Sequence, residues 1–170
     1  MEKSFNLALK KSIAYLHFED GNSFKGYVNR DKTDPELIAG VWGEAAFTTG
    51  MSGYQETMTD PSFLGQHIIF TNAHIGNYNQ DERTMQSKKS HASTLIARNF
   101  SHNDFLAQID IPLFSGVDTR RLVRYLTSGK ATHKSVLTFS EITPSKKSFQ
   151  EAKLKTDDLP LVSQNAPIVH

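Results

Sequence analysis

Short apolar stretches, separated by polar turns that contain glycine, run through most of the chain. The stretches are rich in β-branched and aromatic residues, which favour strands. We therefore expect strands over residues 12–18, 23–28, 44–49, 67–71, 93–98, 113–117 and 135–139. Asp20-Gly21-Asn22 lies between the first two and is typical of a tight turn, because Gly and Asn tolerate positive φ. The first two strands are thus predicted to form a hairpin.

Helical signals are fewer. Asp118 stands where a helix N-cap is expected, residues 119–128 follow with apolar side chains on one face, and Gly129 supplies a stop. We also expect short helices over residues 103–109 and 149–154. Residues 29–39 are polar, contain a proline and are predicted to form a surface loop. The expected fold class is α/β, a single sheet-rich domain with a few short helices.

Composition excludes several classes of function. The 170 residues carry 19 Lys+Arg and 18 Asp+Glu, a balance that gives no reason to expect nucleic acid as a partner. No apolar run approaches the ~20 residues that cross a bilayer, so no membrane association is expected and cytoplasmic is the default location. The absence of cysteine excludes disulfides, thiolate-bound zinc and a cysteine nucleophile in these residues.

Local motifs do not predict catalysis. Gly50-Met51-Ser52-Gly53 lacks the Gly-x-Ser-x-Gly spacing of a nucleophile elbow, so hydrolysis through Ser52 is a remote alternative. The histidines match no metal-ligand spacing, and no phosphate loop occurs, so neither a metal nor a cofactor is expected in this chain. Arg120 and Arg124 are four residues apart and share a helix face. They suit a phosphate or the carboxylates of another protein, or else a solvated face with an ion pair to Asp118 or a nearby acid.

Four stretches, in order along the chain, resemble the small subunit of glutamine-dependent carbamoyl phosphate synthetase. Residues 43–63, GEAAFTTGMSGYQETMTDPSF, resemble the family signature GEVVFNT, MTGYQE and TDPSY. Residues 18–26 resemble the family's LEDGTVFEG, residues 74–78 its PHIGN turn, and residues 116–124 its GIDTR-x-LTR helix start. The chain is therefore identified as a member of this family, over its amino-terminal domain.

The resemblance implies a swivelling β/β/α-type domain over residues 12–155, after an extension at 1–11 and before a tail or linker at 156–170. In the family this domain contacts the large subunit and borders a glutamine amidotransferase domain, which hydrolyses glutamine through a cysteine thioester. The large subunit then makes carbamoyl phosphate from ammonia, bicarbonate and ATP, for pyrimidines and arginine. The partners implied are thus the large subunit and an amidotransferase domain, in the same or a separate chain, and the enzyme as a whole is a ligase.

Matching positions give the expected site residues. Gly50 stands where some members have a serine that touches glutamine, so a backbone contact is expected there. The other matched positions are expected at an interface or in structural motifs: Gly53, Tyr54, Gln55, Glu56, Asp60, Pro61, His74, Gly76, Asn77, Asp118, Thr119, Arg120 and Arg124.

Two departures from the family pattern leave an alternative open. The stretch from Arg98 to Asp118 is roughly ten residues shorter than the family leads one to expect, and Asn72-Ala73 replaces the usual Tyr-Pro before His74. The alternative is a stand-alone paralogue, which acts as a small-ligand sensor or an interaction module without a role in synthesis.

Overall fold

The chain begins with the hairpin that its turn residues predict. The computed structural model describes residues 11–49, 60–71, 74–75, 91–100 and 110–155. Strands β1 (Ser12–Phe18) and β2 (Ser23–Val28) pair antiparallel, with the predicted bounds. Gly21 takes a φ of 92°, and the Asn22 N–H donates to Asp20 Oδ1 at 3.0 Å. The turn is therefore held by its own polar residues.

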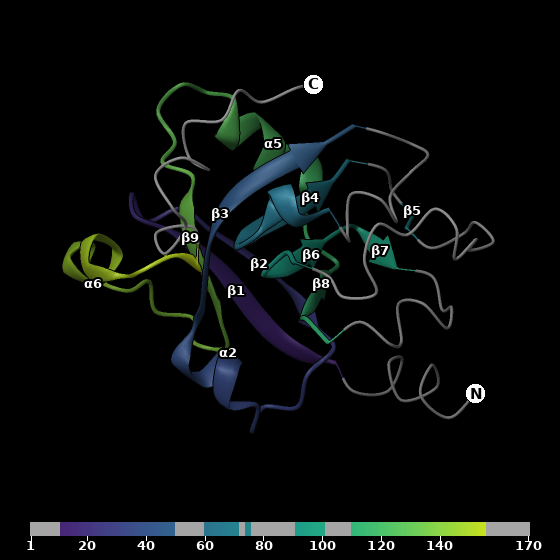
Figure 1. Ribbon diagram of the computed structural model, residues 1–170, viewed down its shortest axis with the longest axis horizontal. Helices are drawn as coiled ribbons and strands as arrows, with labels where there is room; N and C mark the ends of the chain where they lie inside the picture. The colour runs from purple at the N-terminus through teal and green to yellow at the C-terminus, as the bar shows by residue number, and fades with distance from the viewer. Residues whose placement is uncertain (1–10, 50–59, 72–73, 76–90, 101–109, 156–170) are drawn as a thin grey trace.

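Seven strands close into a barrel in the order β1-β2-β8-β6-β4-β3-β9 (Figure 1). The remaining barrel strands are β3 (Val41–Thr48), β4 (Gln66–Phe70), β6 (Thr94–Ile96), β8 (Leu113–Ser115) and β9 (Lys134–Thr138). β3, β4, β6 and β8 run parallel, and the other pairings are antiparallel. A separate pair joins β5 (His74–Ile75) to β7 (Asn99–Phe100). The four parallel strands thus end at the same edge of the barrel.

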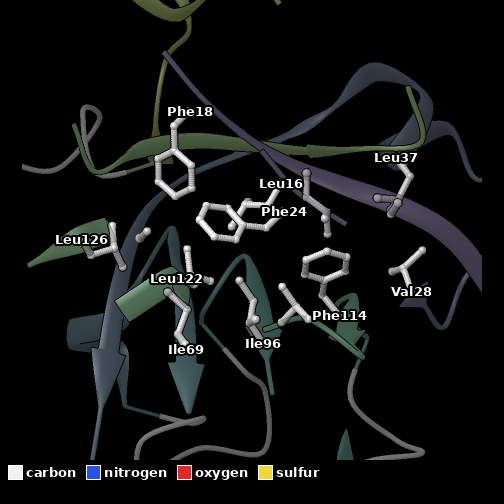
Figure 2. Packing of buried hydrophobic residues seen from close by; sticks show 14 residues of the cluster. Leu16, Phe18, Phe24, Val28, Leu37, Ile69, Ile96, Phe114, Leu122 and Leu126 are labelled. Carbon is white, nitrogen blue, oxygen red and sulfur yellow. The ribbon is translucent and has the colours of Figure 1, made fainter. Parts of the chain in front are cut away.

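Large apolar side chains fill the barrel. Figure 2 shows the core running from Phe18 and Leu126 at one end to Leu37 and Val28 at the other. Phe114 lies within it and is fully buried, which for a phenylalanine contributes about 2 kcal/mol. A second apolar cluster contains Ile68, Phe70, Ala92, Leu95, Ala97 and Leu113. The central strands β4 and β6 contribute to both clusters, as parallel strands that are covered on both faces do.

Two strand glycines make room for rings in the core. A Cβ on Gly26 would lie 2.6 Å from the Ser115 carbonyl oxygen and 2.8 Å from the Phe114 ring. A Cβ on Gly43 would lie 2.8 Å from both His67 Nε2 and the Gly65 carbonyl oxygen. Both glycines are therefore required by packing rather than by a turn.

The loop predicted over residues 29–39 is wrong in its second half, because α2 (Pro35–Ala39) forms there. Asp34 is its N-cap and accepts from the Glu36 N–H at 2.9 Å, and Pro35 occupies the first helical position, where its missing N–H costs nothing. Arg30 reaches both Asp34, at 3.7 Å, and Asp110, at 3.6 Å.

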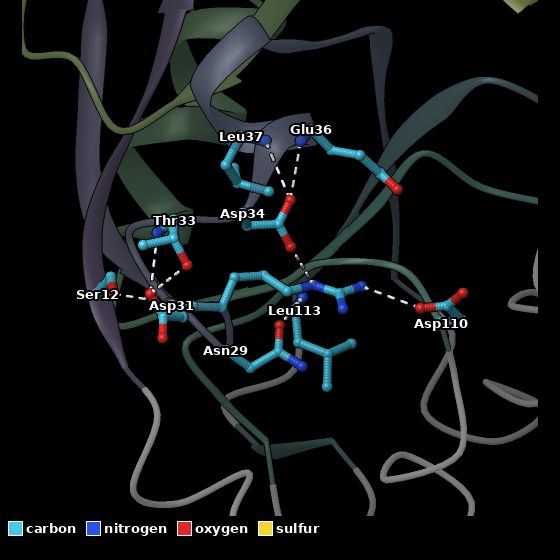
Figure 3. A network of polar contacts seen from close by, with 10 residues as sticks. Ser12, Asn29, Asp31, Thr33, Asp34, Glu36, Leu37, Asp110 and Leu113 are labelled. Atoms are coloured by element: carbon cyan, nitrogen blue, oxygen red, sulfur yellow. Dashed lines mark hydrogen bonds and ion pairs between the residues drawn. The ribbon is translucent and has the colours of Figure 1, made fainter.

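The half-buried side-chain amide of Asn29 anchors the same loop to the barrel. Asn29 Oδ1 accepts from the Leu113 N–H at 2.7 Å, which joins the end of β2 to the start of β8 (Figure 3). The loop that leads into α2 is thus fixed at its first residue by β8 and through Arg30 by Asp34 and Asp110.

Three further helical segments are short: η1 (Pro61–Phe63), α5 (Thr119–Leu126) and α6 (Lys146–Glu151). α6 begins three residues before the predicted start because Ser145 caps it, accepting from the Ser148 N–H at 3.2 Å. No helix among the described residues is long and apolar enough to span a membrane. The predicted class, a sheet-rich α/β domain with few short helices, is confirmed.

Candidate functional site

The carboxyl ends of the parallel strands mark the edge where a site is expected, because ligands in parallel α/β sheets bind there. Of the residues that carry the family resemblance and that the structure describes, residues 116–124 follow the end of β8, one of these parallel strands.

A pocket of about 780 Å³ opens at this edge. Its walls come from the residues that follow β4, β6 and β8 and from the first two turns of α5. They are Thr71, Arg98, Gly116, Val117, Asp118, Thr119, Arg120, Val123 and Arg124. Four of these, Asp118, Thr119, Arg120 and Arg124, are predicted site residues, and the structure brings them together.

Asp118 starts α5 as the sequence predicts. Its Oδ1 accepts from the Arg121 N–H at 3.0 Å, so this carboxylate is engaged by the backbone of the helix that it caps. The helix ends at Leu126, slightly before the predicted residue 128, with Thr127 as its C-cap. The cap sets the direction in which the first turn of α5 meets the pocket.

The three arginines of α5 divide between two faces. Arg120 and Arg124 line the pocket, which confirms that they share a face. Arg121 points elsewhere, with its guanidinium carbon 4.2 Å from the centre of the Phe24 ring and its Nη2 3.4 Å from the Ser23 carbonyl oxygen. Arg121 therefore fastens the helix to the barrel, and the other two remain directed at the pocket.

Arg98 and Thr71 complete the pocket and were missed from the sequence. Arg98 follows β6, and its carbonyl oxygen accepts from the Gly116 N–H at 2.9 Å. Thr71 follows β4, and both its N–H and its Oγ1 donate to the Thr48 carbonyl oxygen at 3.1 Å. Both residues follow the end of a strand, which could have marked them as site candidates. Using that clue requires the order of the strands in the sheet. Both residues are held by backbone hydrogen bonds between neighbouring strand ends.

The pocket carries an excess of positive charge. Within the described ranges, no carboxylate lies within ion-pair distance of Arg98, Arg120 or Arg124. The predicted alternative of an ion pair to Asp118 is therefore not observed. This arrangement can bind an anion, since guanidinium groups donate paired hydrogen bonds to phosphate and carboxylate oxygens.

The remaining predicted site residues lie apart from this pocket or outside the described residues. Asp60 caps η1, accepting from the Ser62 N–H at 2.9 Å, and Pro61 is the first residue of that turn. His74 is in β5, paired with Asn99 of β7. Those outside the described residues are Gly50, Gly53, Tyr54, Gln55, Glu56, Gly76 and Asn77. Among the side chains that the structure describes, no three His, Asp or Glu groups gather to hold a metal ion.

Variants of Asp118 test how much its capping of α5, which forms part of the pocket wall, contributes to stability. Asp118→Ala is expected to lower the free energy of unfolding by about 1 kcal/mol, because the Arg121 N–H loses its acceptor. Asp118→Asn keeps an acceptor oxygen at that position and is the matched control, with a smaller expected loss. Urea unfolding of the three proteins measures the difference. An equal loss in both variants would show that charge, not capping, is what Asp118 supplies.

Fold and site together define a small closed-barrel α/β domain with an arginine-lined pocket at the carboxyl edge of its parallel strands. A family model described as the carbamoyl-phosphate synthase small chain, CPSase domain, matches residues 16–136. The chain belongs to this family.

Several relatives agree with the family match. The carbamoyl phosphate synthase small chain of Caldanaerobacter subterraneus is 36% identical over 138 residues, which cover 74% of this chain and 36% of the relative. The arginine-specific small chain of Bacillus subtilis is 40% identical over 121 residues, 65% of this chain and 32% of the relative. The small chain of Staphylococcus epidermidis is 36% identical over 173 residues, 91% of this chain and 44% of the relative. The matched part thus spans between about a third and less than half of the relatives' length.

Proposed function

We propose that this chain is a non-catalytic domain of glutamine-dependent carbamoyl phosphate synthetase, which docks on the large subunit and supports a glutamine amidotransferase site. The observation that carries the proposal is the family match over residues 16–136, which includes the edge where the parallel strands end. The location that goes with this role is the cytoplasm. The regions proposed around the domain are an extension at 1–11 and a tail or linker at 156–170.

Glutamine hydrolysis is assigned to another polypeptide segment. The amidotransferase chemistry needs a thiolate nucleophile, and these 170 residues contain no cysteine. What remains for this domain is to shape and connect a glutamine site, with the backbone at Gly50 as the proposed point of contact and the other matched motif residues at the interface or in structural motifs. No cofactor is proposed for this chain, and ATP belongs to the large subunit.

Co-purification tests the docking. The tagged chain, isolated from its native host under gentle conditions, is expected to bring down a carbamoyl phosphate synthetase large subunit or a separate amidotransferase. The purified chain alone is expected to release no ammonia from glutamine, and release is expected only in mixtures that also contain the amidotransferase. Recovery of neither partner, or glutaminase activity in the isolated chain, contradicts the proposal.

The arginine-lined pocket favours a second candidate, the stand-alone paralogue that senses a small ligand. A thermal-shift series with glutamine, carbamoyl phosphate, ATP and other nucleotides separates the two. Stabilisation by one ligand, together with no affinity for a large subunit, supports the sensor.

A further inference from the structure

We infer that the pocket at the carboxyl edge is a binding site for a small molecule with a multiply charged oxyanion group, either a phosphate or a di- or tricarboxylate. The first reason is the number of cations. Arg98, Arg120 and Arg124 come from two separate segments and line one pocket. Like charges that line one pocket repel one another, and an anion bound in the pocket would reduce that repulsion.

The charge of the pocket is not neutralised by its own wall. Asp118 is the one acidic residue among the lining residues that the structure describes, and its Oδ1 is committed to the Arg121 N–H. Arg121, the remaining arginine of α5, is held over the Phe24 ring. The pocket therefore has three cations against one carboxylate, and that carboxylate already has a structural task.

The first turn of α5 adds to the same preference. Thr119 and Arg120 line the pocket, so the amino-terminal end of this eight-residue helix faces it. Backbone N–H groups at a helix start carry partial positive charge and attract anions. This contribution supports the arginines and would not define a site without them.

The dimensions suit a small molecule. Ligand pockets commonly enclose about 300 to 1,000 Å³, and the volume of about 780 Å³ lies within that range. Arginine is the side chain that recognises planar carboxylate and phosphate edges with paired hydrogen bonds. The site would thus select an anion by its charge and shape rather than attract anions non-specifically.

Isothermal titration of the 170-residue chain with inorganic pyrophosphate and with citrate, at ionic strength held constant with sodium chloride, tests this site. We expect at least one of the two anions to bind, and the preferred anion identifies phosphate or carboxylate as the ligand chemistry. Arg120→Gln and Arg124→Gln are each expected to weaken binding by about tenfold, and the double variant to abolish it. Thermal melts establish that each variant is folded.

Lys25→Gln is the matched control, since it removes one positive charge from an exposed position on β2, outside the residues that line the pocket. It is expected to leave binding within about twofold of the original value. Equal losses in Lys25→Gln and Arg120→Gln, or no binding of either anion, overturn the inference. Binding of hexaglutamate while both small anions fail also overturns it, in favour of an acidic protein surface. The site does not depend on docking to a large subunit, so a failed co-purification leaves this result unaffected.

Discussion

Gly26→Ala is expected to lower the free energy of unfolding by about 3 kcal/mol, at the upper end of overpacking costs. The new methyl group would lie 2.6 Å from the Ser115 carbonyl oxygen and 2.8 Å from the Phe114 ring. The ring could tilt, but the carbonyl belongs to the neighbouring strand β8 and cannot withdraw without disturbing the pairing of Tyr27 with Ser115. The barrel therefore cannot accommodate the new methyl group without a large loss of stability.

Urea denaturation measures this loss from the midpoint and the slope of the transition. Lys25→Ala is the control, because Lys25 is the adjacent, exposed residue on the same strand. It is expected to change stability by less than about 0.5 kcal/mol. A Gly26→Ala protein as stable as the Lys25→Ala protein would mean that β2 and β8 are not packed as described.

Acidification is the second change expected to have a large effect. His67 is fully buried, and burial lowers the pKa of its imidazole to about 4. The backbone groups of Ser135 and Val41 act to raise this pKa, but burial outweighs them. Since the folded-state pKa lies below the unfolded value of 6.5, the contribution to stability is complete above that value and is lost as the pH falls toward 4. Between about pH 7.5 and about pH 4.5 the loss is expected to be about 2 to 3 kcal/mol.

Urea unfolding of the original protein and of His67→Gln across this pH range isolates the contribution of His67 to the loss of stability in acid. The variant is less stable at neutral pH, but its stability is expected to fall less with acid, because the titrating ring is absent. Some loss of stability with falling pH is still expected in the variant because of His17, whose pKa is also lowered by burial. Identical slopes in the two proteins would contradict the assignment to His67.

A carboxylate near the hairpin turn responds at lower pH. Burial of Asp20 would raise its pKa, but hydrogen bonds from Asn22 and from Tyr125, the latter at 2.8 Å, outweigh burial and hold the pKa below its ordinary value. The stability from this group is present above the unfolded pKa and is lost as the pH falls through the lowered value. It therefore does not interfere in the range where His67 titrates.

Local chemistry was enough to predict much of the secondary structure. The bounds of β1 and β2 follow from their apolar pattern and from Asp20-Gly21-Asn22, and the start of α5 follows from Asp118. The helix at 35–39 is not predicted from the sequence, because a proline in a polar stretch usually indicates a loop. The pair Asp34-Pro35, a cap followed by a residue suited to the first helical position, was the signal that could have found it.

Local sequence patterns could not predict that the sheet closes into a barrel or which residues line the pocket, because both depend on pairings between distant strands. β3 begins at Val41 rather than residue 44, because Gly43 is a strand residue opposite a buried ring and not a break. Arg98 reaches the site only because β6 lies between β4 and β8, an order set by pairings between distant residues. The sequence alone assigns Arg120 and Arg124 to one helix face because they lie four positions apart. That Arg98 lines the same pocket depends on the order of all the strands in the sheet.

The position of β9 in the barrel has a consequence for how the chain folds during synthesis. β9 inserts between β1 and β3, pairing Leu16 with Leu137 and Trp42 with Val136. Until residues 134–138 leave the ribosome, both neighbouring strands keep an unpaired edge, and such edges invite pairing with other chains. Among the described strands, β1 therefore gains its β9 partner only after residues 134–138 have been synthesised, and the barrel closes only then.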